Sequence, residues 1–143
     1  MKWVKRGRIF VRETTEGWWY SHCQAPAPIL ISESIIRVFF GAWDANGISR
    51  VNYVDVDSED PGKVLYVSDE PVLDLGQPGT FDENGIVPMG VGRGGDKIHL
   101  YYTGFQLGHK VSYYMMGGVA VSHDNGQTFR RVSGAPMLDR SDE

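Results

Sequence analysis

Cysteine is nearly absent from this sequence, and with three further absences this narrows the possible folds and functions. Cys23 is the only cysteine, so no internal disulfide framework supports the fold. A basic excess is also lacking, because the formal net charge is −4, and this argues against a nucleic-acid partner. No apolar run approaches the roughly 18 residues of a membrane-spanning helix. Residues 1–8 lack the apolar stretch of a signal peptide, so we expect a cytoplasmic protein without a membrane partner.

Helical periodicity is missing as well. No window of about eleven residues repeats its apolar positions at the spacing of an amphipathic helix. The chain instead has 18 Gly and 7 Pro, and its apolar runs are rich in Val, Ile, Tyr and Phe, which suit the pleated surface of a sheet. The length suits one domain. These features predict a single all-β domain.

Residues that often hold metals or cofactors form no working pattern here. The histidines, at positions 22, 99, 109 and 123, lack the spacing of zinc ligands. The acidic run at 55–60 lacks the glycine and closing glutamate of a calcium-binding EF-hand loop. The glycine-rich residues 90–95 join two expected strands, whereas a dinucleotide fingerprint leads into a helix. We therefore expect neither a metal nor a cofactor.

An internal repeat indicates the architecture. Residues 36–41 parallel 98–103, residues 71–74 parallel 136–139, and residues 54–57 parallel 121–124, at offsets of 62, 65 and 67 residues. Turn signals divide each unit into four expected strands. They lie near 27–32, 35–42, 49–56 and 63–68 in the first unit, and near 86–91, 97–104, 116–122 and 128–132 in the second. Four-stranded units at this period are typical of β-propeller blades.

We place the first blade at residues 21–79 and the second at 80–143. Residues 1–20 form a lead-in, in which residues 8–11 are expected to be a strand that closes the last blade of a ring. Two blades alone leave a blade face and strand edges open, which invites association. We therefore expect a homodimer that closes one five-bladed ring, with a truncated fragment as the alternative.

Residues 122–129 read Ser-His-Asp-Asn-Gly-Gln-Thr-Phe and resemble the Asp boxes of sialidase-like β-propellers. Asp124 is expected to accept hydrogen bonds from the backbone amides of a tight turn. Gly126 can adopt a positive φ without steric cost, and Phe129 is expected to enter the core. We interpret this string as a device that holds a hairpin and not as a catalytic site.

Four segments, residues 21–26, 79–88, 101–105 and 119–129, are together similar to a known group of bacterial proteins. The group belongs to the arabinanase/levansucrase/invertase-like five-bladed propeller superfamily, and its members are often described as candidate glycosidases. The resemblance covers nearly the whole chain but only the first half of a typical member. It implies a carbohydrate-active protein that binds a glycan in a central funnel, where characterised enzymes carry acidic residues on different blades.

The resemblance implies that Asp82, just before the inner strand of the second blade, is the supporting acid of such a funnel. The alternative is a loop carboxylate that caps a turn. Glu83 is a second candidate for contacting substrate if its loop is irregular, since successive residues of a regular strand point to opposite faces. The first blade has Ala25-Pro26 where classical members carry Asp, which leaves no carboxylate there to act as a base.

His22 is the candidate base in its place, because its ordinary pKa is near 6.5. Aligning Pro28 with Pro88 sets His22 on Asp82, and Gln24 is expected to bind substrate beside it. Trp18, Trp19 and Trp43 are candidates for stacking on sugar rings, with filling of the core as the alternative.

Two functions fit these residues. One is a glycosidase-like enzyme whose site is completed by a second chain, with Asp82 and His22 as catalytic residues. The other is a non-catalytic glycan-binding or assembly module that keeps the propeller scaffold without the full acidic set. Loss of turnover in Asp82→Asn would distinguish them.

Overall fold

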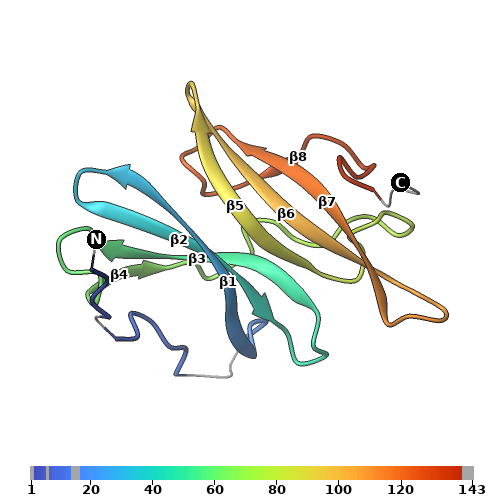
Figure 1. Cartoon of the computed structure of the whole chain (residues 1–143), viewed down its shortest axis with the longest axis horizontal. Helices are drawn as coiled ribbons and strands as arrows, with labels where there is room; N and C mark the ends of the chain where they lie inside the picture. The colour runs from blue at the N-terminus through green and yellow to red at the C-terminus, as the bar shows by residue number, and fades with distance from the viewer. Residues whose placement is uncertain (1, 6, 14–16, 140–143) are drawn as a thin grey trace.

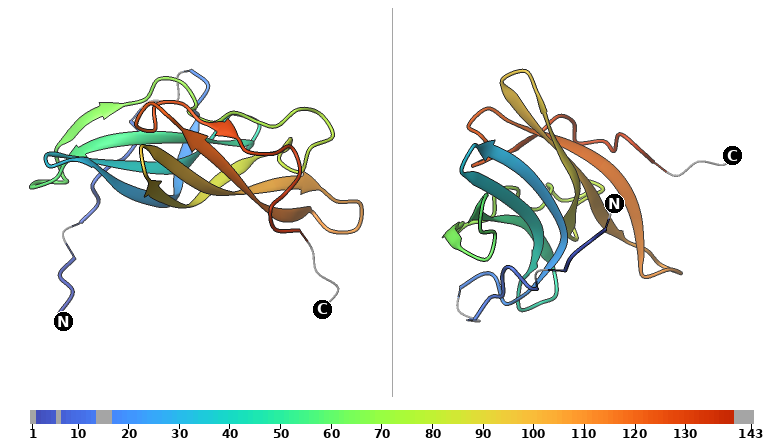
Figure 2. Two further views of the ribbon diagram at one scale, coloured as in Figure 1. Left: turned by 90° about the horizontal axis from the view of Figure 1, so that it is seen from above. Right: turned by 60° about the vertical axis from the view of Figure 1, so that its left-hand side comes forward.

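The chain folds into two four-stranded antiparallel sheets that lie face to face (Figure 1). The computed structural model describes residues 2–5, 7–13 and 17–139, and these contain strands but no helix. The first sheet runs in the order β1 (Ser21–Ser32), β2 (Ile35–Trp43), β3 (Ser49–Asp57) and β4 (Val64–Val67). The second runs β5 (Ile86–Gly94), β6 (Lys97–Leu107), β7 (Tyr113–Ser122) and β8 (Arg130–Arg131). Figure 2 shows the twisted sheets side by side.

The all-β prediction is confirmed, and each of the eight strands predicted within the two units corresponds to an observed one. The largest difference is in β1, which begins at Ser21 and not near residue 27. The sequence hides this start because proline and left-handed backbone interrupt the strand pattern there. The last strand is shorter than predicted, because residue 128 still belongs to the preceding turn. The number of blades in a complete ring stays a prediction.

The pairing register shows that the two sheets are structural repeats. Ile36 pairs with Val56 in the first sheet, and Ile98 pairs with Ser122 in the second. This gives an offset of 62 residues between β2 and β6, as predicted, but 66 between β3 and β7. The predicted offset of 67 for this strand pair was therefore wrong by one residue. The short bridges Val51–Leu73 and Gly117–Leu138 occupy corresponding places and support the 66-residue offset.

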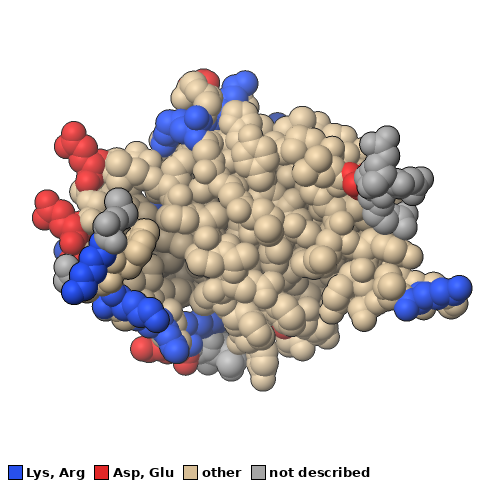
Figure 3. All heavy atoms as spheres, viewed as in Figure 1, with Lys and Arg blue, Asp and Glu red and all other residues tan. Residues whose placement is uncertain are grey.

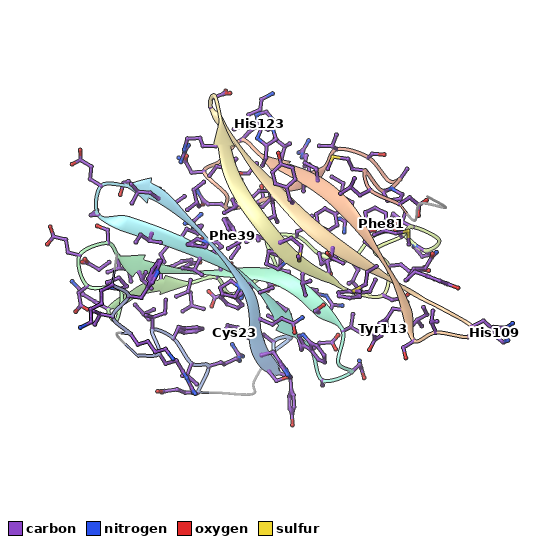
Figure 4. All side chains as sticks on the ribbon, in the orientation of Figure 1. Cys23, Phe39, Phe81, His109, Tyr113 and His123 are labelled. Carbon is purple, nitrogen blue, oxygen red and sulfur yellow. The ribbon has the colours of Figure 1, made fainter. Side chains whose placement is uncertain are left out.

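The main core lies between the sheets. Phe39, Val51 and Tyr53 from the first sheet pack with Ile98, Leu100 and other buried side chains of the second. In Figure 4, Phe39 lies where the two sheets meet. Burial of large apolar side chains stabilises a fold by about 1.5–3 kcal/mol each, so this layer holds the two sheets together.

The turn between β7 and β8 also joins the sheets. Phe129 packs edge-on against Phe39 with ring centroids 5.4 Å apart, and a Cβ on Gly126 would lie 2.8 Å from the Phe39 ring. The buried Arg37 guanidinium makes two 2.7 Å hydrogen bonds with Asp55 and donates a third, of 2.9 Å, to the Asn125 carbonyl. An ion pair of the first sheet thereby holds the turn of the second.

Asp124 organises that turn from within. Its carboxylate accepts hydrogen bonds from the amides of Gln127 and Thr128, each at 3.0 Å, and from the hydroxyls of Ser122 and Thr128. Partial burial opposes its ionisation, but these hydrogen bonds prevail and lower the pKa of Asp124 to about 2. Gly126 has a φ of +81°, as the turn requires.

The two outer faces of the pair of sheets differ. The outer face of the first sheet is covered by the lead-in, whose Trp19 packs on Phe40 at 5.0 Å between ring centroids and on Phe10 at 5.9 Å. Residues 8–11 form no strand in the described part of the chain. The closing strand predicted there needs a last blade to pair with, so that pairing stays a prediction.

The outer face of the second sheet is uncovered. We call this the open face, and its exposed apolar members are Met89, Tyr101, Met115, Met137 and Leu138. They border a shallow apolar groove of about 480 Å³. Figure 3 shows that charged side chains gather at the end with the lead-in, whereas the surface over the second sheet is broadly uncharged in that view.

Candidate functional site

The first half of β1 has an unusual backbone. His22 and Ala25 have φ values of +63° and +51°, in the left-handed region that residues other than glycine rarely occupy. The pairing with β2 is irregular on both sides of Gln24. Such a conformation costs on the order of 1–3 kcal/mol per residue and is found mainly where surrounding structure holds it for a function. This segment is therefore the first place to look for a site.

His22 and Trp43 form an aromatic pair at this end of the sheet. Their rings stack with centroids 4.4 Å apart and planes inclined by 26°. His22 is exposed and Trp43 is half-buried. The Ser21 hydroxyl lies 2.9 Å from His22 Nδ1, within hydrogen-bonding distance. The buried indole N–H of Trp43 has no partner within the described part of the chain. The cluster thus combines flat apolar surface with polar groups, which is the pattern of sugar sites.

Trp19 holds the backbone beneath this pair. Its side chain is only 1% exposed, and its indole N–H donates to the carbonyls of Ser21 and His22 at 2.9 and 2.8 Å. It fills the core, as in the alternative that the sequence left open, and it fixes the left-handed turn of the chain at His22. Trp18 is half-buried and donates to the Asp69 carbonyl at 2.7 Å, on the side of the lead-in that faces β4.

Gln24 lies between the two sheets. It pairs with Gly41 of β2, and a Cβ on Gly41 would lie 3.0 Å from the Gln24 side chain and 2.8 Å from Val87 of β5. The missing side chain of Gly41 therefore makes room for both. Gln24 is half-buried where the opening strands β1 and β5 approach each other.

Asp82 is fully buried in the loop that precedes β5. Tyr102 and Arg131 both donate to its Oδ2, at 2.9 and 2.6 Å, and the Thr80 hydroxyl lies 2.9 Å from its Oδ1. A Cβ on Gly76 would lie 2.0 Å from the carboxylate, so glycine is required for this close approach. Burial, followed by the Asp82 charge, raises the pKa of Tyr102, which keeps its hydroxyl protonated as a donor. In this structure the hydrogen bonds of the Asp82 carboxylate are therefore made with protein side chains.

Glu83 closes the loop that leads to β5. Its Oε2 accepts a 2.7 Å hydrogen bond from the Gly79 amide, and its side chain is half-buried. The loop is irregular, so the strand argument against Glu83 as a site residue does not apply. Its carboxylate is used within the loop.

The structure brings His22 and Trp43 into contact at the start of β1, with Gln24 two residues along the same strand, whereas the carboxylate of Asp82 is bonded to residues of the second unit. Tyr20 donates to the Trp43 carbonyl as Asn84 donates to the Phe105 carbonyl, at an offset of 64 residues. His22 therefore corresponds to residues near Ile86, and the predicted alignment of His22 with Asp82 was wrong. Aligning the two prolines misled because each opening strand carries its bulge at a different place.

The partners of Asp82 were missed by sequence reasoning. Arg131 is 49 residues away and contacts Asp82 only because β8 lies beside β7. Tyr102 is buried in the core, and its role as a donor depends on the position of Asp82. The one available signal was the adjacent Arg130-Arg131 pair after the hairpin. A buried carboxylate needs a cationic partner, and an arginine on the edge strand of the same sheet can supply one.

No cluster of three or more His, Cys, Asp or Glu side chains suitable for a metal occurs within residues 2–5, 7–13 and 17–139. Over the same ranges there is no helix of the length and hydropathy needed to cross a membrane.

The sequence is similar to proteins about twice its length. No family model matches the chain. Two uncharacterized proteins of Mycobacterium tuberculosis, one from each of two strains, are 38% identical to it over 138 residues. The match covers 96% of this chain but 46% of those proteins, so the chain spans about half the length of the curated relatives it matches.

Solved structures add the fold class. A family 117 glycoside hydrolase from the marine bacterium Zobellia galactanivorans superposes with a TM-score of 0.71 at 16% identity, over 96% of this chain and 40% of that one. Candidate glycoside hydrolases from Bacteroides ovatus and Parabacteroides distasonis give TM-scores of 0.56 and 0.59 at 25% and 20% identity. Each covers 80% of this chain, and 31% and 33% of its own. The chain therefore has a glycoside hydrolase-like fold and corresponds to part of the longer chains that share it.

Proposed function

We propose that this chain is a carbohydrate-binding part of a glycoside hydrolase-like propeller, with the glycan bound at the start of β1. The observation that carries this is the exposed His22 ring, held in a left-handed backbone conformation and stacked on Trp43. Strain of this kind is maintained where it serves a site. The stacked rings offer a face for a sugar, and the neighbouring polar groups of Ser21 and Gln24 offer hydrogen bonds to its hydroxyls.

Binding without hydrolysis is the function that the geometry favours. Glycosidic cleavage uses two carboxyl groups about 5–9.5 Å apart across the scissile bond. Asp82, the predicted acid of the second blade, is buried and bonded to Tyr102 and Arg131. We propose that it acts as a positioning residue that holds the inner edge of the second sheet.

Hydrolysis is the second candidate, favoured by the fold shared with glycoside hydrolases. In that case His22 would serve as the base, and a second chain would supply the missing acid. Asp82→Asn would abolish turnover, as would His22→Ala.

A second copy of the chain is our proposed partner. The internal repeat allows the exposed fractions of equivalent residues to be compared, because each open-face residue corresponds to a residue of the first unit that the second sheet covers. Phe39 is 0% exposed, whereas its counterpart Tyr101 is 45% exposed. Leu73 is 3% exposed and its counterpart Leu138 is 66% exposed. The open face thus has the chemistry of a sheet–sheet interface without its second layer, and exposed apolar patches of this kind mark association sites.

We propose that this second copy also completes the glycan site, because a sheet docked beside β5 adds side chains next to the inner strands β1 and β5. The closed five-bladed ring stays a prediction.

Glycan binding is tested with His22→Ala and Trp43→Ala on a glycan array, followed by calorimetry with the best ligand. We expect each variant to weaken binding at least tenfold. The matched controls are His109→Ala, at a distant exposed turn, and Tyr66→Ala, an exposed aromatic of β4, which should bind as the parent does. Equal loss in the controls, or no effect of either site variant on a bound glycan, would remove this proposal.

A further inference from the structure

The lead-in and the start of β1 enclose a cleft beside His22. It has a volume of about 520 Å³, and Arg8, Arg12, Tyr20, Ser21 and His22 contribute to its lining. The cleft thus adjoins the glycan site on the side away from the second sheet. Nothing in the sequence pattern indicated it, because only the fold of the lead-in brings residues 8–13 beside residues 20–23.

Arginine contributes to the described part of the lining at two positions, Arg8 and Arg12, beside one carboxylate, that of Glu13. Guanidinium groups bind carboxylates, sulfates and phosphates through paired hydrogen bonds, and hydroxyls such as those of Tyr20 and Ser21 add further donors.

The cleft is built on the same support as the glycan site. The Arg12 guanidinium lies over the Trp19 ring, 4.4 Å from its centroid, and the backbone of Arg12 hydrogen-bonds Cys23 of β1. Trp19 in turn binds the carbonyls of Ser21 and His22. One buried indole therefore fixes both an arginine and the left-handed backbone that presents His22. Arginine held flat on an aromatic ring loses less freedom on binding a planar anion.

We propose that this cleft binds an anionic substituent, a carboxylate or a sulfate ester, of the glycan that stacks at His22 and Trp43. This inference rests on the proposed function and specifies its ligand as an acidic glycan. The sugar ring would lie against His22, with its charged group turned toward Arg8 and Arg12. The guanidinium groups of Arg8 and Arg12 would disfavour ligands with a cationic group at the same place.

The test uses four hexasaccharide probes in two matched pairs. The first pair is an oligogalacturonate and its carboxyl-reduced neutral form, and the second is a sulfated galactan and its desulfated form. Binding to the full chain is measured by calorimetry at low and at physiological salt. We expect one acidic member to bind about tenfold or more tightly than its neutral match, with a difference that shrinks as salt rises.

Two variants connect that difference to the cleft. Arg8→Gln should lower affinity for the acidic probe about tenfold and leave affinity for the neutral probe unchanged. Arg12→Lys keeps the charge but loses the paired donors, so it should also lower affinity for the acidic probe. Lys97→Gln, which removes one positive charge from β6, is the control and should change neither. Circular dichroism and tryptophan fluorescence report whether each variant is folded.

The outcomes separate the two proposals. A carboxylate or a sulfate preference that depends on Arg8 supports the cleft and identifies the group it binds. Equal affinity for acidic and neutral probes, or insensitivity to Arg8→Gln, overturns the cleft inference and leaves glycan binding at His22 intact. Absence of binding to every member of both pairs and of the array overturns the proposed function, and the cleft inference with it.

Discussion

Replacement of Asp82 by Asn distinguishes a structural carboxylate from one kept for substrate. Asn has nearly the same shape, so the change removes the charge without opening a cavity. The amide oxygen can still accept from the Arg131 guanidinium and the Tyr102 hydroxyl, which both donate to one carboxylate oxygen, but it lacks the charge that strengthens these two hydrogen bonds. Hydrogen bonds to a charged group contribute about 1.5–3 kcal/mol each, and breaking a buried ion pair costs about 3–5 kcal/mol. Arg131 is 21% exposed, so water relieves part of this cost, and we expect a loss of about 2–4 kcal/mol in the free energy of unfolding.

Urea unfolding followed by tryptophan fluorescence and circular dichroism measures this loss. Asp74→Asn is the matched control, because Asp74 also pairs with an arginine but its side chain is 69% exposed. Exposed ion pairs contribute about 0–1 kcal/mol, so the control should change little. A residue held in place for substrate tends to reduce stability, and its removal is neutral or stabilising. An Asp82→Asn protein as stable as the parent would therefore refute the structural role and return Asp82 to the list of site acids.

Three further predictions concern the β7–β8 turn and the open face. Asp124→Asn should reduce stability by about 1 kcal/mol near pH 6, after allowance for solvent screening of this partly exposed group. Because the folded pKa lies near 2, below the ordinary 3.8, the stabilisation by the charge is complete above pH 4 and is lost toward pH 2. The gap between parent and variant in acid titrations should therefore narrow over that range, and a constant gap would contradict the assignment. Gly126→Ala should lower the thermal midpoint more than Gly47→Ala. Both positions have positive φ, but a Cβ on Gly126 would lie only 2.8 Å from the Phe39 ring, whereas one on Gly47 would lie 3.8 Å from the Trp43 ring, an ordinary contact. Equal shifts would therefore show that the turn is not held against the first sheet. Tyr101→Asp should give a monomer of 16.0 kDa in light scattering, where the parent gives twice that mass. The control Leu30→Asp, at an exposed apolar residue of β1, should keep the mass of the parent. A monomeric parent would contradict the proposed dimer.

The strand pattern was accessible from sequence because it depends on local chemistry. Alternating apolar residues and turn dipeptides bounded most strands to within a few residues. The hydrogen bonds of Asp124 were also accessible, since its acceptors and donors all lie within residues 122–128. Each of these features is decided by neighbours in the chain.

The candidate site was predicted less completely because it depends on register and on contacts between distant residues. Trp43 and His22 were both named, but their stacking follows from a bulged β1 that no local pattern indicated. The burial of Asp82 depends on Arg131, which reaches it through the order of strands in the second sheet. The ion pair of Arg37 and Asp55 was missed for the same reason, since only the pairing of β2 with β3 sets these residues opposite each other.

The aromatic residues of the lead-in decide how far association can proceed. A subunit with an association surface at each end adds further subunits without limit and forms a filament, because each added subunit exposes another free association surface. Here Phe10, Trp18 and Trp19 occupy one end and leave the other bare. The described part of the molecule then has a valence of one: pairing covers the open face, no second apolar face of this kind remains there, and growth stops at two. Removal of residues 1–19 would raise that valence to two and turn a self-limiting pair into a polymer.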